Sequence, residues 1–244
     1  MSFPASAADI LTSVLLILAT ITLYQSFAWL QKRSGRIWLN PMLLSILVII
    51  PCLLLTEMPF QQFYRATEPL NMLLEPAVVA LGFPLYQQLS QIARQWKVIF
   101  SLLILGALLV ISISFCLTML LLNYPQIAVS LSLKSITTPI GLALTSELQG
   151  DTSVTAFAII LAGLFGALLG PAWLKAINVH SAKAQGLAIG AASHALGTAT
   201  ISKTSYEHGA YGSLALIISA IVTALISPGL IDYLQVFFTG FVGI

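Results

Sequence analysis

The chain is poor in charged residues. Only 7% of its 244 residues are Asp, Glu, Lys or Arg, whereas 58% are hydrophobic. A soluble domain carries roughly 25% charged residues, so this composition excludes a soluble fold and predicts an integral membrane protein. At about twenty residues for each crossing, the length allows roughly six to eight crossings and leaves no room for a separate soluble domain.

The sequence also lacks the features of several other classes of protein. Its ten Lys and Arg residues are too few for a nucleic-acid surface. Cys52 and Cys116 lie inside apolar runs, which indicates buried free thiols rather than a disulfide or a metal pair. No metal-ligand spacing is present, and no Asp or Cys accompanies Ser193 and His194 as a nucleophilic triad would require. We therefore expect no enzyme, no metal and no cofactor.

Apolar runs fill the N-terminal half and predict four membrane spans. These spans cover about residues 10–30, 41–56, 70–89 and 98–122. Basic loops follow the first and third spans, and because short loops rich in Lys and Arg stay in the cytoplasm, the N-terminus is expected outside. The third span contains Glu75-Pro76 and is predicted to be irregular.

Two polar interruptions break the apolar sequence of the C-terminal half. Lys134 to Gly141 reads K-S-I-T-T-P-I-G, and Ser193 to Ala199 reads S-H-A-L-G-T-A. Both combine helix-breaking residues with hydrogen-bonding ones, a pattern typical of broken helices that form a binding site at the bilayer midplane. In lipid, such irregular backbone is tolerated only where protein buries it or where it lines a wet cavity.

The basic residues favour two re-entrant hairpins, residues 126–148 and 186–206, on either side of a full span at about 154–174. In that arrangement eight of the ten Lys and Arg residues lie in the cytoplasm, whereas only six do if both stretches cross fully. A last span, about 211–226, places the C-terminus outside. We predict an all-α membrane protein with about six full spans and two opposed re-entrant hairpins as an inverted pair, with full crossing as the alternative.

One membrane domain is expected over residues 1–244. Residues 1–125 would hold the scaffold spans, and residues 126–231 would hold the two hairpins with the span between them and the last span. Residues 232–244 form an apolar tail that is too short to cross the membrane.

The two breaks together predict a site for a small anion. In each hairpin a second helix would return from the break to the side on which the chain entered. Thr138-Pro139 suits the start of that helix in the first hairpin, and Gly197-Thr198 suits it in the second. Two helix N-termini, each with about half a positive charge, and the ammonium of Lys134 favour a carboxylate. The predicted substrate-binding residues are Lys134, Ser135, Thr137, Thr138, Pro139, Ser193, His194, Gly197 and Thr198.

Structural roles compete with these assignments. Lys134 could bond the carbonyl groups that end the incoming arm, although the cost of a charge in lipid favours a functional role. His194 is a candidate for proton coupling, and a packing histidine explains it equally well. Glu75 is a weaker coupling candidate, because it lies only about 9 Å into its span. Each threonine by itself is explained as a helix cap, so only the group of polar residues taken together indicates a ligand.

At these residues the chain resembles the LrgB/CidB family of bacterial inner-membrane proteins. Besides the two interruptions, the matching motifs are Asn40-Pro41, Glu75 to Gln88 and Gly166 to Pro171. The family commonly has Gly at the position of Glu75 and Gly-Ile at Ala195-Leu196. The first difference weakens an essential role for Glu75.

The resemblance implies two functions. Family names come from a proposed holin/antiholin-like role in murein hydrolase export and autolysis, usually with a small LrgA/CidA-type membrane partner. Related plastid proteins look like glycolate/glycerate translocators, and bacterial members have been linked to pyruvate. From the residues we expect a carrier of small monocarboxylates, with proton coupling and a homodimer as further hypotheses; the alternative is the holin-like regulator.

Overall fold

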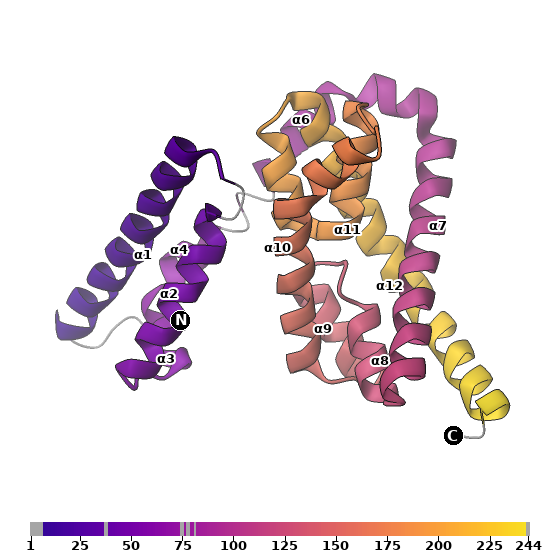
Figure 1. The fold of residues 1–244 in the computed structure, drawn as a ribbon, viewed down its shortest axis with the longest axis horizontal. Coiled ribbons are helices and arrows are strands. Elements are labelled where there is room, and N and C mark those ends of the chain that lie inside the picture. Colours follow the sequence, from indigo (N-terminus) through magenta and orange to yellow (C-terminus); the bar gives the residue numbers. More distant parts are fainter. Residues whose placement is uncertain (1–6, 37–38, 74–75, 77–78, 81, 243–244) are drawn as a thin grey trace. The chain divides into compact units, whose positions relative to one another are not determined.

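The computed structural model describes residues 7–36, 39–73, 76, 79–80 and 82–242. Within these ranges the chain is helical and has no strand, which confirms the predicted all-α class. The chain divides into two compact units, Met1–Ala80 and Leu81–Ile244 (Figure 1).

The first unit is a small helical assembly. Its helices are α1 (Ala7–Ser34), α2 (Pro41–Leu55), α3 (Phe60–Ala66) and α4 (Glu68–Met72), with α1 packed against α2 and α3. The start of α2 is fixed by Asn40, whose side-chain oxygen accepts hydrogen bonds from the N–H groups of Met42 and Leu43 at 2.9 and 3.3 Å. The coupling candidate Glu75 lies outside the described residues.

The second unit contains the predicted site. Its helices are α6 (Gly82–Gln87), α7 (Leu89–Leu122), α8 (Pro125–Ser132), α9 (Thr138–Glu147), α10 (Thr152–Ala176), α11 (Ala182–Ser202) and α12 (Tyr206–Val242). α11 packs against both α10 and α12. One hydrophobic cluster, which includes Phe115, Leu133 and Ile136, joins α7 to the end of α8 and to α12. The first break is therefore embedded in the core.

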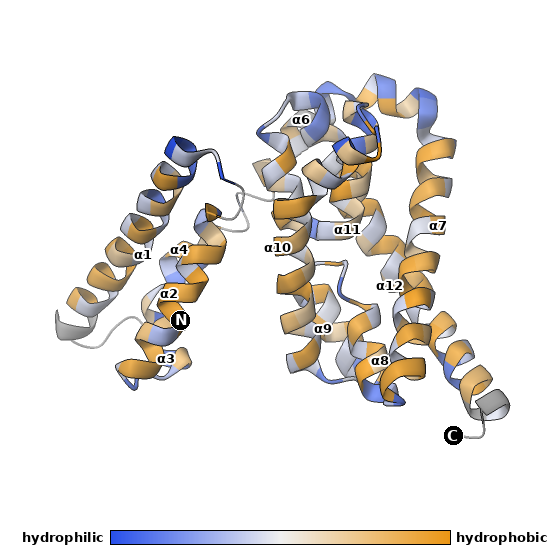
Figure 2. Cartoon of the chain, in the orientation of Figure 1, coloured by the Kyte–Doolittle hydropathy of each residue, from blue (hydrophilic) through white to orange (hydrophobic). Residues whose placement is uncertain are grey.

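Four described helices are long and apolar enough to cross a membrane. They cover Ile10–Ser34, Leu89–Leu122, Thr152–Ala176 and Tyr206–Phe238. Figure 2 shows apolar residues along α7 and α10 and hydrophilic residues near their ends. Large apolar side chains are exposed on these helices, for example Leu120 and Trp173. Water would disfavour such faces and lipid would not, so the composition and the fold agree on a membrane protein.

The predicted second span is one helix, and the predicted third span is divided. α2 covers Pro41–Leu55, close to the predicted 41–56, whereas the described part of 70–89 includes the end of α4, all of α6 and the start of α7. Pro51 lies within α2 without ending it. Neighbouring helices can satisfy the backbone groups that such a proline frees in a membrane protein.

The last helix is longer than predicted. We expected the final span to end near residues 227–229, but α12 continues through Pro228 to Val242. The extension has partners: Ile231, Leu234 and Phe238 are buried in the same cluster as Phe115, and the Phe115 and Phe238 rings are 6.0 Å apart. Residues 233–242 are therefore part of a packed helix rather than a separate tail.

Both polar interruptions break helices, as predicted. Residues 133–137 separate α8 from α9. Within α11, Ser193 (φ −129°, ψ 17°) and His194 (φ 41°, ψ −140°) are non-helical and divide it into two arms. Figure 1 shows α8 and α9 together at the end of the unit where α7 ends and α10 begins.

Candidate functional site

The first break is held by buried apolar residues on either side of its polar ones. Leu133 and Ile136 are fully buried, whereas Lys134 and Ser135 are only half-buried. Thr137 is the N-cap of α9, so a helix begins at Thr138-Pro139, where the sequence predicted one. The Thr137 side chain makes no capping hydrogen bond. The first turn of α9 therefore keeps N–H groups that its cap does not satisfy.

Lys134 is directed at protein groups. Its ammonium donates to the Ser114 hydroxyl of α7 and to the carbonyl oxygen of Leu131, which is 3.3 Å away in α8. Ser114 lies eight residues from the end of α7, about 12 Å along the helix, so the ammonium lies well inside the apolar layer. The second bond is the structural role that the sequence left open for Lys134.

The second break is fastened to α10 by His194. The Nε2 atom of His194 lies 2.8 Å from the carbonyl oxygen of Ile159. Since a carbonyl only accepts, Nε2 carries a proton. The Thr198 hydroxyl donates to the His194 carbonyl at 2.8 Å, and Thr198 is completely buried. In this structure the His194 Nε2 atom and the Thr198 hydroxyl both have protein partners.

Two glycines on α10 make room for the second break. A Cβ atom on Gly163 would lie 2.8 Å from the His194 ring, and one on Gly166 would overlap the Ser193 hydroxyl. Gly197, on the far side of the break, is closed in by Ser193 and Ile189. Ser193, His194 and Gly197 are therefore in close contact with the helices beside them.

The two breaks approach the same turn of α10. The carbonyl of Ile159 accepts the His194 bond, and the Ile159 side chain lies 2.6 Å from where a Cβ on Gly141 of α9 would be. Lys134, however, faces α7. The structure thus brings the two breaks near a common element without directing Lys134 and His194 at one shared ligand position.

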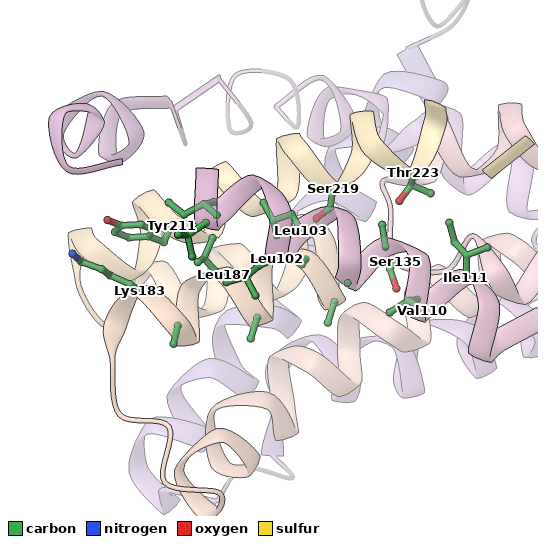
Figure 3. A pocket seen from close by; sticks show the side chains of 18 of the residues that line it. Leu102, Leu103, Val110, Ile111, Ser135, Lys183, Leu187, Tyr211, Ser219 and Thr223 are labelled. Atoms are coloured by element: carbon green, nitrogen blue, oxygen red, sulfur yellow. The ribbon is translucent and has the colours of Figure 1, made fainter. Parts of the chain in front are cut away.

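A cavity of about 610 Å³ lies between α7, α11 and α12. Figure 3 shows the hydroxyl groups of Ser135, Ser219 and Thr223 toward one end, with Lys183 and Tyr211 at the other. The Ser219 and Tyr211 hydroxyls are buried without a hydrogen-bond partner. Of the nine predicted site residues, Ser135 lines this cavity, and Ser193 lines a smaller groove of about 270 Å³ between α10 and α11.

The sequence reasoning missed the contribution of α12 to this cavity. Tyr211, Ser219 and Thr223 all line it, and their spacings of eight and four residues place them on one helix face. That spacing was the only sequence signal for a polar face on α12. It was not recognised because a serine or threonine every few residues is common in membrane helices and usually bonds its own backbone.

A second, polar pocket of about 470 Å³ lies where α8, α9 and α12 come together. Its lining includes Gln126, Glu147, Gln149 and Asp232. Both carboxylates are exposed. Within the described part of the chain, no group of three His, Cys, Asp or Glu side chains is arranged to hold a metal ion.

Comparison with known proteins gives a consistent set of relatives. The model of the LrgB-like family matches residues 20–233. The chain is 34% identical over 204 residues to an uncharacterized protein of Haemophilus influenzae, covering 82% of this chain and 88% of that protein. It is 33% identical over 224 residues to the holin-like protein CidB of Staphylococcus epidermidis, covering 91% and 97%. No solved structure matches.

Proposed function

Because the chain belongs to the LrgB-like family, we propose that it is a holin-like protein of the bacterial inner membrane that regulates murein hydrolase export and autolysis. The observation that carries this proposal is the similarity to holin-like CidB along 91% of the chain. The comparisons support this alternative better than the monocarboxylate carrier that we expected from the residues.

The contacts at the breaks agree with this proposal. Lys134 is hydrogen-bonded to Ser114 and Leu131, and His194 is hydrogen-bonded to Ile159. Contacts of this kind stabilise a fold and do not require a ligand. A regulator that acts through another membrane protein also needs an apolar surface to contact it, and exposed Phe157 and Trp173 on α10 belong to such a surface. The proposed partner is a small LrgA/CidA-type membrane protein.

The orientation of the second unit follows from its charges. Arg94, Lys97, Lys175, Lys183 and Lys203 lie near the start of α7, the end of α10 and the two ends of α11, which share one end of the unit in Figure 1. Glu147, Asp151 and Asp232 lie toward the opposite end. The positive-inside rule assigns the basic end to the cytoplasm and the end of α12 to the periplasm. α8 with α9, and the two arms of α11, then form the opposed re-entrant pair.

The test of the holin-like function uses a bacterial strain that lacks its own LrgB-like proteins. The chain is expressed alone and with an LrgA/CidA-type partner, and murein hydrolase activity in the medium is measured together with detergent-induced autolysis. We expect expression of the chain to change both the murein hydrolase activity in the medium and the rate of autolysis, and we expect the partner to alter the size of these changes. Unchanged hydrolase release and autolysis, with the protein present in the membrane, would contradict the proposal.

A carrier of small monocarboxylates such as glycolate, glycerate or pyruvate is the second candidate. The observation in its favour is the group of hydroxyls from Ser135, Ser219 and Thr223 beside the first break, because the buried Ser219 hydroxyl has no partner in the protein. A carboxylate oxygen would supply one, and an unsatisfied hydroxyl in an apolar environment is costly.

Proteoliposomes distinguish the two functions. A carrier takes up labelled pyruvate or glycolate with saturation, and unlabelled substrate competes. Ser219→Ala would then reduce uptake, whereas Ser213→Ala, whose hydroxyl bonds the Gly209 carbonyl of its own helix, serves as the matched control. Absence of saturable uptake, with hydrolase release intact in cells, eliminates the carrier.

A further inference from the structure

The Lys183 end of the large cavity has a chemistry that neither proposed function uses. Among the described residues that line the cavity, Lys183 alone is charged. Its ammonium lies 5.7 Å from the centre of the Tyr211 ring. Tyr211 is completely buried, and its hydroxyl has no hydrogen-bond partner. A cation and an unsatisfied donor thus lie together at one end of the cavity, away from the hydroxyls of Ser135, Ser219 and Thr223.

The walls beyond this end are apolar. Val98, Leu102 and Leu103 of α7 face Leu187 and Ala191 of α11 across the cavity. The next polar residue of α12 that lines the cavity is Ser219, eight residues and about 12 Å from Tyr211. The Lys183 half of the cavity therefore suits a chain-like apolar group that ends in an anion.

The cavity opens sideways between α7 and α11. Val98 and Leu102 line it and are also 63% and 54% exposed, and Ala188 of α11 is exposed as well. The outward face of α7 around this opening is apolar and belongs to a membrane-length helix. In a bilayer, an acyl chain would reach the cavity directly through such an opening.

We propose that the Lys183 half of this cavity binds an anionic phospholipid, with the phosphate at Lys183 and Tyr211 and one acyl chain between α7 and α11. The charges around the opening agree with this ligand. Arg94, Lys97 and Lys203 lie near the same end of the unit, and basic pockets between membrane helices on the cytoplasmic side bind anionic headgroups. The hydroxyls at the other end of the cavity lie beyond this site.

Native mass spectrometry of the purified full-length protein tests the site. Phosphatidylglycerol and phosphatidylethanolamine with identical acyl chains are added in separate titrations. We expect phosphatidylglycerol to be retained preferentially, and Lys183→Ala to lower its affinity about five-fold, as one cation at a membrane surface contributes. Tyr211→Phe should also weaken retention. Lys175→Ala, an exposed lysine that does not line the cavity, is the matched control.

Two further experiments test whether the bound phosphate belongs to a membrane phospholipid. Leu102→Trp narrows the opening and should reduce binding of both phospholipids, and a phosphatidylglycerol with a photoreactive acyl chain should crosslink to α7 and α11 of the unmodified protein. Crosslinks elsewhere, equal effects of Lys183→Ala and Lys175→Ala, or displacement of the lipid by free oleate would overturn the proposal. So would a lipid-free dimer in which a second copy closes the opening. The crosslinking arm does not depend on the folding of any variant.

Discussion

At the scale of single residues, the second break depends on two unusual positions. His194 has φ 41°, a backbone conformation that residues with a Cβ rarely adopt, and such strain costs about 1–3 kcal/mol. Gly166 lies where any side chain would meet the Ser193 hydroxyl. The surrounding packing, including the bond from His194 to the Ile159 carbonyl, must outweigh that strain.

Replacing His194 tests the strain. His194→Gly and His194→Ala both remove the ring and its bond, but only the alanine retains a Cβ at positive φ. We expect the glycine variant to be more stable by about 1 kcal/mol, although glycine within a regular helix is less stable than alanine by a similar amount. Thermal unfolding in detergent provides the comparison. A more stable alanine variant would show that residue 194 is in fact helical.

Replacing glycines on long helices tests the fit of the break. Gly166→Ala places a methyl group against Ser193, so we expect loss of stability by about 1–3 kcal/mol through overpacking. Gly106→Ala on α7 is the control, because a Cβ there meets nothing within 4 Å. The control should unfold at the same or a higher temperature, since alanine favours a helix. Equal behaviour of the two variants would contradict the close approach of α10 and α11.

At the scale of elements, Pro228 was a poor guide to where a helix ends. Pro51 lies inside α2, as the predicted span 41–56 required, whereas the chain remains helical beyond Pro228 because its apolar residues have partners on α7 and α8. Polar clusters were better guides. The interruptions at residues 133–137 and 193–194 were located from sequence, since a helix in an apolar setting is rarely broken without polar groups to satisfy its backbone.

The far half of α12 gives a test of this packing. Leu234→Ala removes a buried side chain from the cluster around Phe115, so we expect a loss of about 2 kcal/mol in the free energy of unfolding. Leu225→Ala, on the same helix but 78% exposed, should change it little. Thermal unfolding measured in one detergent compares the pair. If both substitutions had the same effect, the extension of α12 would not be packed as described.

The course of α8 and α9 is tested by labelling. In a background without Cys52 and Cys116, Ser153→Cys should react with an impermeant maleimide added to intact cells, and Ser181→Cys should react only after lysis. Both serines are exposed: Ser153 lies in the first turn of α10, and Ser181 lies beyond its other end as the N-cap of α11, which makes them a matched pair. If α8 and α9 instead carry the chain fully across the membrane, the reactivities are reversed.

At the scale of the whole molecule, the sequence was informative about class and much less so about contacts. Scarcity of charge predicted a membrane protein, and motif resemblance predicted the family. The bond of Lys134 to the Leu131 carbonyl was among the roles considered from sequence, but its bond to Ser114 and that of His194 to Ile159 were not predictable. Ser114 lies twenty positions away, and the Ile159 carbonyl belongs to the backbone, which carries no sequence signal. The cavity was missed for the same reason: it exists only where three helices converge.

The glycines of α10 also bear on the order in which the chain is built. Residues 152–176 leave the ribosome before residues 182–202, and helices generally assemble in the order of synthesis. The surface of α10 at Gly163 and Gly166, against which the second break packs, is thus already formed when the strained turn at His194 leaves the ribosome. Nascent chains halted before Ser202 should consequently hold a finished α10 with its docking face unfilled.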